Sequence, residues 1–130
     1  HLENVEDVVN FRHVVVLLVG IVVDRDSLEK AIEFFANTDL GRFRFVTKFA
    51  DIDSLLTVHH NQHTEVRFSL NTQTIISQYE RGTASLKERI GAAKKIALAG
   101  YPLGFLIAPI IIYDNWENEY SQVALILALS

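Results

Sequence analysis

Three histidines in a short polar segment are the residues best suited to metal chemistry. His59, His60 and His63 lie within five positions, and His59 and His63 have an i, i+4 spacing. That pair could bind zinc or nickel if the local chain were helical. Asn61 and Gln62 favour a loop instead, and no acidic third ligand is fixed nearby in sequence. We therefore predict a solvated loop without a metal site, and the role of these histidines stays open.

A second candidate is a basic cluster that could contact DNA phosphates. Within positions 81–95 only Glu88 offsets it, and lysine and arginine supply most of a protein's affinity for a phosphate backbone. The alternative is the solvated face of an amphipathic helix. We prefer this alternative because the chain carries a formal charge of −4 and lacks a general basic field. The cluster consists of Arg81, Lys87, Arg89, Lys94 and Lys95.

Acidic residues around the single tryptophan could form an acid/base group. Asp114, Glu117 and Glu119 flank Trp116, but carboxylates at the start of a helix are favoured by the helix dipole alone, and we prefer that interpretation. The chain contains no cysteine. This excludes a disulfide framework, a cysteine-ligated zinc site, a thiol nucleophile and an iron–sulfur cluster held by this chain.

The composition is that of one globular domain spanning residues 1–130. Of the 130 residues, 49% are hydrophobic and 22% are charged. Residues 1–13 are expected to be irregular or derived from a tag, since the chain starts at His1 and contains no methionine. The longest apolar run, Val14–Val23, is about half the roughly 20 residues that cross a bilayer, and nothing resembles a signal peptide. We therefore expect no membrane association and a cytoplasmic location.

Apolar, β-branched runs alternate with amphipathic patterns along the chain. Two capping boxes begin helices, with Asp26 and Glu29 in the first and Ser85 and Glu88 in the second, and Asn71 is expected to cap a shorter helix. A short helix is expected after Asp51. The periodicity predicts strands over 14–23, 42–49, 65–70 and 103–112. It predicts helices over 26–37 and 85–99 and from about 116, and the shorter helix over 71–79.

This order predicts an α/β fold with a parallel sheet covered by helices. Four parallel β/α units make half of a TIM-type barrel or a small open sheet, and neither is closed. Half a barrel exposes two strand edges, so we expect association with a partner copy or with missing segments of the same protein. The apolar run Val14–Val23 and the apolar tail Val123–Leu129 are the expected contact surfaces.

Three motifs in fixed order carry a resemblance to a known family. They are GRFRFVTKF (Gly41–Phe49), RFSLN (Arg67–Asn71) and AGYPLGFLIAP (Ala99–Pro109). The region Ser27–Tyr120 resembles spore photoproduct lyase, a radical S-adenosylmethionine DNA repair enzyme. The resemblance implies that the chain is part of a (β/α)6 partial barrel. It also implies S-adenosylmethionine as a cofactor and DNA as a partner of the parent family.

The resemblance also assigns roles to individual residues. It implies that Lys48 and Ser69 line the S-adenosylmethionine pocket, with Asn71 beside them and the backbone of Ala108 near the adenine. A lysine at the carboxyl end of a strand suits this role, because ligands bind there in α/β sheets and an ammonium can donate to a carboxylate or to ribose hydroxyls. The alternatives are a solvated strand-end lysine and a structural serine.

The departures from the family concern sulfur chemistry. The family's Cys-x3-Cys-x2-Cys cluster motif lies upstream of the matched region and is absent, so this chain is not expected to bind the [4Fe–4S] cluster. The family's hydrogen-donating cysteine falls at Val14. Our preferred hypothesis is a fragment or engineered derivative that self-associates and is inactive alone. Three alternatives stay open: an enzyme whose cluster another chain supplies, a residual S-adenosylmethionine- or DNA-binding module, and a purely structural half-barrel.

Overall fold

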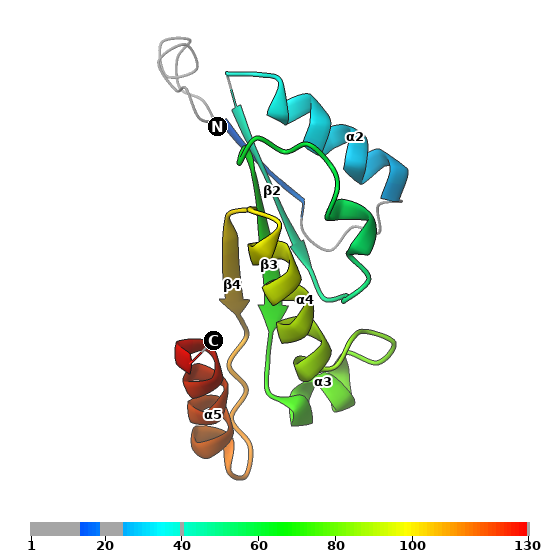
Figure 1. Cartoon of the computed structure of the whole chain (residues 1–130). Helices are drawn as coiled ribbons and strands as arrows, with labels where there is room; N and C mark the ends of the chain where they lie inside the picture. The colour runs from blue at the N-terminus through cyan, green and yellow to red at the C-terminus, as the bar shows by residue number, and fades with distance from the viewer. Residues whose placement is uncertain (1–13, 19–24, 40, 130) are drawn as a thin grey trace, which may run out of the picture.

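The computed structural model describes residues 14–18, 25–39 and 41–129 (Figure 1). The predicted alternation of strands and helices is confirmed in this part of the chain, whereas the predicted segment 1–13 lies outside the described residues. The elements are β1 (Val14–Leu18), α2 (Arg25–Ala36), β2 (Gly41–Thr47), the short 3-10 helix η1 (Asp53–Leu55), β3 (Thr64–Leu70), α3 (Gln73–Tyr79), α4 (Leu86–Leu98), β4 (Leu103–Ile107) and α5 (Trp116–Leu129).

The four described strands form one parallel sheet in the order β1-β2-β3-β4. Parallel neighbours need a crossover connection, which α2 supplies between β1 and β2, and α3 with α4 between β3 and β4. The predicted α/β class with parallel strands is therefore confirmed. Figure 1 shows the arrowheads of β3 and β4 directed toward the end of the molecule where α3 and α5 lie.

One face of the sheet forms the core. Alternate residues of β2 and β3 point to this side, and Phe43, Val66 and Phe68 are almost fully buried. The helices contribute Ile32 from α2 and Ile96 from α4, both with no exposed surface. Burying each of these side chains contributes about 1.5–3 kcal/mol, so the helix-covered face supplies most of the stability.

The opposite face of β2 and β3 is polar. Glu65 of β3 accepts hydrogen bonds from Arg44 of β2 and from Arg67 of β3. Gly104 of β4 pairs in register with Arg67, and a Cβ added at Gly104 would lie 3.0 Å from the Cγ of Arg67. The missing side chain at position 104 therefore leaves room for the arginine and its carboxylate partner.

Several predicted boundaries need correction. The strand predicted over 103–112 ends at Ile107, and Ile110 and Ile112 beyond it are 58% and 75% exposed. The cap of α3 is Thr72 rather than Asn71. The first helix begins at Arg25, so Asp26 lies inside its first turn, where it pairs with Lys30.

The strand predicted over 42–49 ends at Thr47, whereas the start of α4 is as predicted. The capping box of α4 is confirmed: the Ser85 hydroxyl accepts from the Glu88 amide at 3.1 Å, and the Glu88 carboxylate accepts from the Ser85 amide at 2.8 Å. Of the predicted strand 14–23, β1 contains Val14–Leu18, and positions 19–23 lie outside the described residues. In the described part of the chain, no helix is long and apolar enough to cross a membrane.

Candidate site at the carboxyl ends of the strands

The predicted site residues Lys48 and Ser69 lie at the carboxyl ends of β2 and β3. Thr47 pairs with Phe68 in the parallel register, so the next step along both strands sets Lys48 beside Ser69. Phe68 and Leu70 point into the core, which directs Ser69 to the polar face. Ser69 is 5% exposed, so its side chain lies at a largely buried position beside Lys48.

Lys48 is paired with a carboxylate from a distant part of the chain. Its ammonium donates to Glu80 at 3.0 Å, and the lysine side chain keeps 44% of its surface exposed. Glu80 follows α3 and is only 11% exposed. One of the three ammonium N–H groups is thus used by Glu80, and the ammonium remains accessible from solvent.

Arg89 completes this network and corrects our interpretation of the basic cluster. Its side chain has no exposed surface, so it does not belong to the solvated face of α4. The guanidinium donates to the other Glu80 oxygen at 2.9 Å and to the backbone carbonyl of Ser69 at 2.7 Å. It also donates to the Ala84 carbonyl and the Thr83 hydroxyl. Arg89 therefore joins β3 to the loop before α4.

The charge state of Glu80 follows from its two cationic partners. Burial alone would raise the pKa of this carboxyl, but hydrogen bonds and attraction from Lys48 and Arg89 outweigh burial and hold the pKa below its ordinary value of 4.5. Glu80 is therefore a carboxylate at neutral pH. Lys48, Glu80 and Arg89 together therefore carry one excess positive charge.

Asn71 is the first residue after β3, and its side chain hydrogen-bonds to the loop that follows β4. Its amide donates to the Pro109 carbonyl at 2.9 Å, and its side-chain oxygen accepts from the Thr72 amide and from the Tyr120 hydroxyl. Asn71 is 1% exposed. Its contacts fix the backbone next to Ala108, which is the other predicted site residue on this side.

Helix α5 makes a second set of contacts with the same loops. The Tyr113 hydroxyl donates to Glu119 at 2.7 Å and lies 2.6 Å from the Thr72 hydroxyl. Thr74 also donates to Glu119, and the bonds from Thr74 and Tyr113 lower the pKa of this carboxyl. Glu119 thus connects α5 to Thr74 of α3 and to Tyr113 in the loop before α5.

Val14 lies far from the other predicted site residues in the sheet. It pairs with Gly41 at the amino end of β2, seven positions before Lys48. At about 3.3 Å per residue, Val14 and Lys48 lie toward opposite ends of the sheet. The structure therefore places Lys48, Ser69, Asn71 and Ala108 together at the carboxyl ends of the strands. Val14 lies outside this group.

The histidine segment is a loop, as predicted. Asn61 and Gln62 adopt positive φ angles of 51° and 58°. The His60 Nε2 donates to the Ala99 carbonyl at 2.9 Å, and the His63 Nδ1 donates to the Phe35 carbonyl at 2.7 Å. Within the described ranges, no group of three metal-binding side chains is present.

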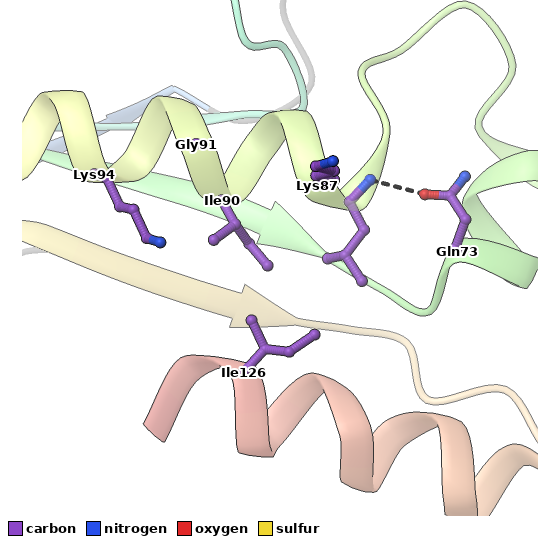
Figure 2. Close-up of a pocket in the computed structure, with 7 residues that line it drawn as sticks. Gln73, Lys87, Ile90, Gly91, Lys94 and Ile126 are labelled. Carbon is purple, nitrogen blue, oxygen red and sulfur yellow. Dashed lines mark hydrogen bonds between the residues drawn. The ribbon is translucent and has the colours of Figure 1, made fainter. Parts of the chain in front are cut away.

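A groove of about 530 Å³ lies between α4 and α5 on the helix-covered side. Figure 2 shows Ile90 of α4 and Ile126 of α5 pointing toward each other across it, with Lys87 and Lys94 on the same helix as Ile90. These two lysines are exposed, as expected for the solvated face of an amphipathic helix. None of the four predicted site residues lines this groove.

Comparison with known proteins identifies the family. A family model described as spore photoproduct lyase matches residues 11–129. The chain is 50% identical over 97 residues to the spore photoproduct lyase of Clostridium acetobutylicum, covering 75% of this chain and 29% of that protein. It is 50% identical over 106 residues to the Bacillus subtilis enzyme, covering 82% and 31%. The chain belongs to the spore photoproduct lyase family.

Solved structures of spore photoproduct lyase share this fold. One, complexed with dinucleoside spore photoproduct, superposes with a TM-score of 0.75 at 49% identity and covers 78% of this chain and 30% of its own. Another, a mutant with bound AdoMet and dinucleoside spore photoproduct, gives 0.76 at 48% identity, covering 79% and 30%. The chain thus spans under a third of the length of these relatives.

Sequence reasoning did not place two further residues beside Lys48 and Ser69, namely Glu80 and the buried Arg89. One signal for Arg89 was present: it lies three and seven positions before the buried residues Ala92 and Ile96, so it shares their helix face. No comparable signal marks Glu80, because its partner Lys48 lies 32 positions away.

Proposed function

We propose that this chain provides the S-adenosylmethionine-binding wall of a spore photoproduct lyase barrel. Lys48 and Ser69 would contact the cofactor directly, and Asn71 would hold the backbone at Ala108 against the adenine. The observation that carries this proposal is the accessible ammonium of Lys48 beside Ser69, both at the carboxyl ends of parallel strands.

The chemistry of these groups fits S-adenosylmethionine. The Lys48 ammonium can donate to the ligand's carboxylate or ribose hydroxyls while it keeps its bond to Glu80. The Ser69 hydroxyl can donate or accept. The Asn71–Pro109 hydrogen bond supports a fixed loop, so the Ala108 backbone would present its polar groups in one position.

The sulfur-dependent parts of the family's chemistry are proposed to lie outside these residues. A [4Fe–4S] cluster is held by cysteine thiolates, and the 130 residues contain none, so the donor set does not fit the cluster. The position of the family's hydrogen-donating cysteine holds valine, at Val14. We therefore propose that the chain alone is inactive, and that a longer protein or a partner would be needed for DNA photoproduct repair in the cytoplasm.

Calorimetric titration with S-adenosylmethionine tests the binding role. We expect measurable binding by the parent chain and at least a tenfold loss in Lys48→Ala. The matched control is Lys95→Ala, which removes an exposed ion-paired lysine from α4. Equal affinities of all three proteins would contradict the assigned pocket, and absence of binding by the parent chain would contradict the function.

Anaerobic reconstitution tests the proposed inactivity. The chain is incubated with iron and sulfide, and its absorbance and its conversion of spore photoproduct are measured. We expect neither iron–sulfur absorbance nor thymine product. Either signal would refute the proposal that the chain cannot act alone.

We also propose that the sheet is part of an incomplete barrel whose exposed edges associate. In the described sheet, no strand lies beyond β4, and unpaired edges favour pairing with another chain. The apolar tail supports this idea, since Leu125 and Leu129 are 58% and 79% exposed. Light scattering should detect a dimer or larger species, and a monomer at high concentration would contradict self-association.

A further inference from the structure

Glu80 connects the exposed ammonium of Lys48 to the fully buried guanidinium of Arg89. Its two carboxylate oxygens bind different cations, at 3.0 Å for Lys48 and 2.9 Å for Arg89. The exposed fraction falls along this series from 44% for Lys48 through 11% for Glu80 to 0% for Arg89. An anchored arginine thus holds the carboxylate, and the carboxylate holds the lysine.

The backbone around Lys48 is tied to the same anchor. The Lys48 carbonyl accepts a hydrogen bond from the Ala84 amide at 3.1 Å, and the Ala84 carbonyl accepts from Arg89 at 2.9 Å. Arg89 also donates to the Ser69 carbonyl at 2.7 Å. Both predicted ligand-binding residues are therefore positioned by one buried guanidinium.

We propose that Glu80 and Arg89 are positioning residues for S-adenosylmethionine binding. This inference rests on the function proposed above. Lysine has a flexible four-carbon stem that can place its ammonium in many positions. The bond to Glu80 holds the ammonium at the strand ends before the ligand binds. The Lys48 side chain therefore loses less conformational entropy on binding. Arg89 acts indirectly, because its hydrogen bonds hold Glu80 and the Ser69 backbone in place.

A double-mutant cycle on S-adenosylmethionine affinity tests this role. The four proteins are the parent chain, Glu80→Gln, Lys48→Ala and the double variant, each titrated calorimetrically. We expect Glu80→Gln to weaken binding about tenfold when Lys48 is present, the lower end of the range known for groups that orient metal ligands. We expect less than a twofold effect in the Lys48→Ala background, because Glu80 then has no ammonium to orient.

A merely structural role for Glu80 would give a different result. Loss of Arg89's partner would then weaken binding equally whether or not Lys48 is present, and equal losses in the two backgrounds overturn the inference. Asp53→Asn is the matched control, since it removes the exposed carboxylate that pairs with Lys95 at 3.2 Å. Its affinity for S-adenosylmethionine should equal that of the parent chain.

Glu80→Asp covers the case in which Glu80→Gln does not fold. This variant keeps the negative charge beside Arg89, but its shorter side chain cannot reach both cations. We expect a several-fold loss of affinity that again disappears in the Lys48→Ala background, and an unchanged affinity would overturn the inference. Failure of the parent chain to bind S-adenosylmethionine overturns the proposed function itself, whereas binding without coupling to Lys48 overturns only the positioning role.

Discussion

Two carboxylates in this protein each bridge two cations, but in different surroundings. Glu80 joins Lys48 to Arg89 at the carboxyl ends of the strands, where Glu80 is 11% exposed and Arg89 has no exposed surface. Glu65 joins Arg44 to Arg67 on the polar face of the sheet, and these three side chains are 24%, 30% and 33% exposed. The number of partners is the same, and the burial differs.

The difference in burial means that the two networks contribute differently to the structure. A buried charge that loses its partner cannot regain its hydration, whereas a half-exposed charge can turn to solvent. The Glu80 network is therefore committed to one geometry, which suits a ligand-binding edge. The Glu65 network links strands that the core already holds together, so its loss should cost less.

The largest effect is expected from Arg89→Met. The substitution leaves Glu80 without its buried partner and the carbonyls of Ser69 and Ala84 without their donor. We expect the free energy of unfolding to fall by about 3–5 kcal/mol, measured by urea denaturation. Arg67→Met on the polar face is the matched control, with an expected loss of about 1 kcal/mol. Equal losses would show that burial does not distinguish the two networks.

Glu80→Gln should cost about 2–3 kcal/mol at neutral pH, because it replaces two charge-assisted hydrogen bonds. The cost should depend on pH. The pKa of Glu80 in the folded protein lies below its ordinary value of 4.5. The carboxylate's contribution to the free energy of unfolding is therefore fully present above about pH 4.5, and it is lost as the pH falls through the folded pKa. Urea denaturation between pH 3 and pH 7 should therefore show that the free energies of unfolding of the parent chain and of Glu80→Gln become more similar as the pH falls. A difference that grows in acid would contradict this sign.

Much of the fold follows from local sequence patterns, and the exceptions have physical reasons. Ser85 and Glu88 predicted the start of α4 because a capping box needs only four consecutive residues. The apolar run after Ile107 was wrongly predicted as strand, since Pro109 cannot donate to a ladder and its carbonyl is used by the Asn71 amide.

The site was only partly predictable for a related reason. Strand periodicity places Lys48 and Ser69 at neighbouring strand ends. The contacts that hold them come from far along the chain: Glu80 lies 32 positions from Lys48, and Tyr120 lies 49 positions from Asn71. No local pattern encodes such pairs, because they depend on how the crossovers return the chain to the sheet.

Gly104→Ala tests how tightly the polar-face network is packed. The added Cβ would meet Arg67 Cγ at 3.0 Å and Glu65 Oε2 at 3.3 Å, so the bridging pair must shift. We expect a loss of about 1 kcal/mol in thermal or urea unfolding. In an Arg67→Ala background the same change should be neutral or stabilising, because alanine is favoured over glycine in a strand. A loss in both backgrounds would place the strain in the backbone of β4 instead.

Asp53→Asn should have the smallest effect and sharpens the comparison most directly. Lys95 and Asp53 lie 3.2 Å apart, close to the 3.0 Å between Lys48 and Glu80, but their side chains are 57% and 71% exposed. Water and salt screen such a pair, so we expect a change below about 0.5 kcal/mol in urea denaturation at neutral pH, and a smaller one in high salt. Since the two lysine–carboxylate distances are nearly equal, a small effect here beside a large one at Glu80 would assign the difference to burial and to Arg89. A loss above about 1 kcal/mol would instead mean that distance alone sets the strength of ion pairs in this protein.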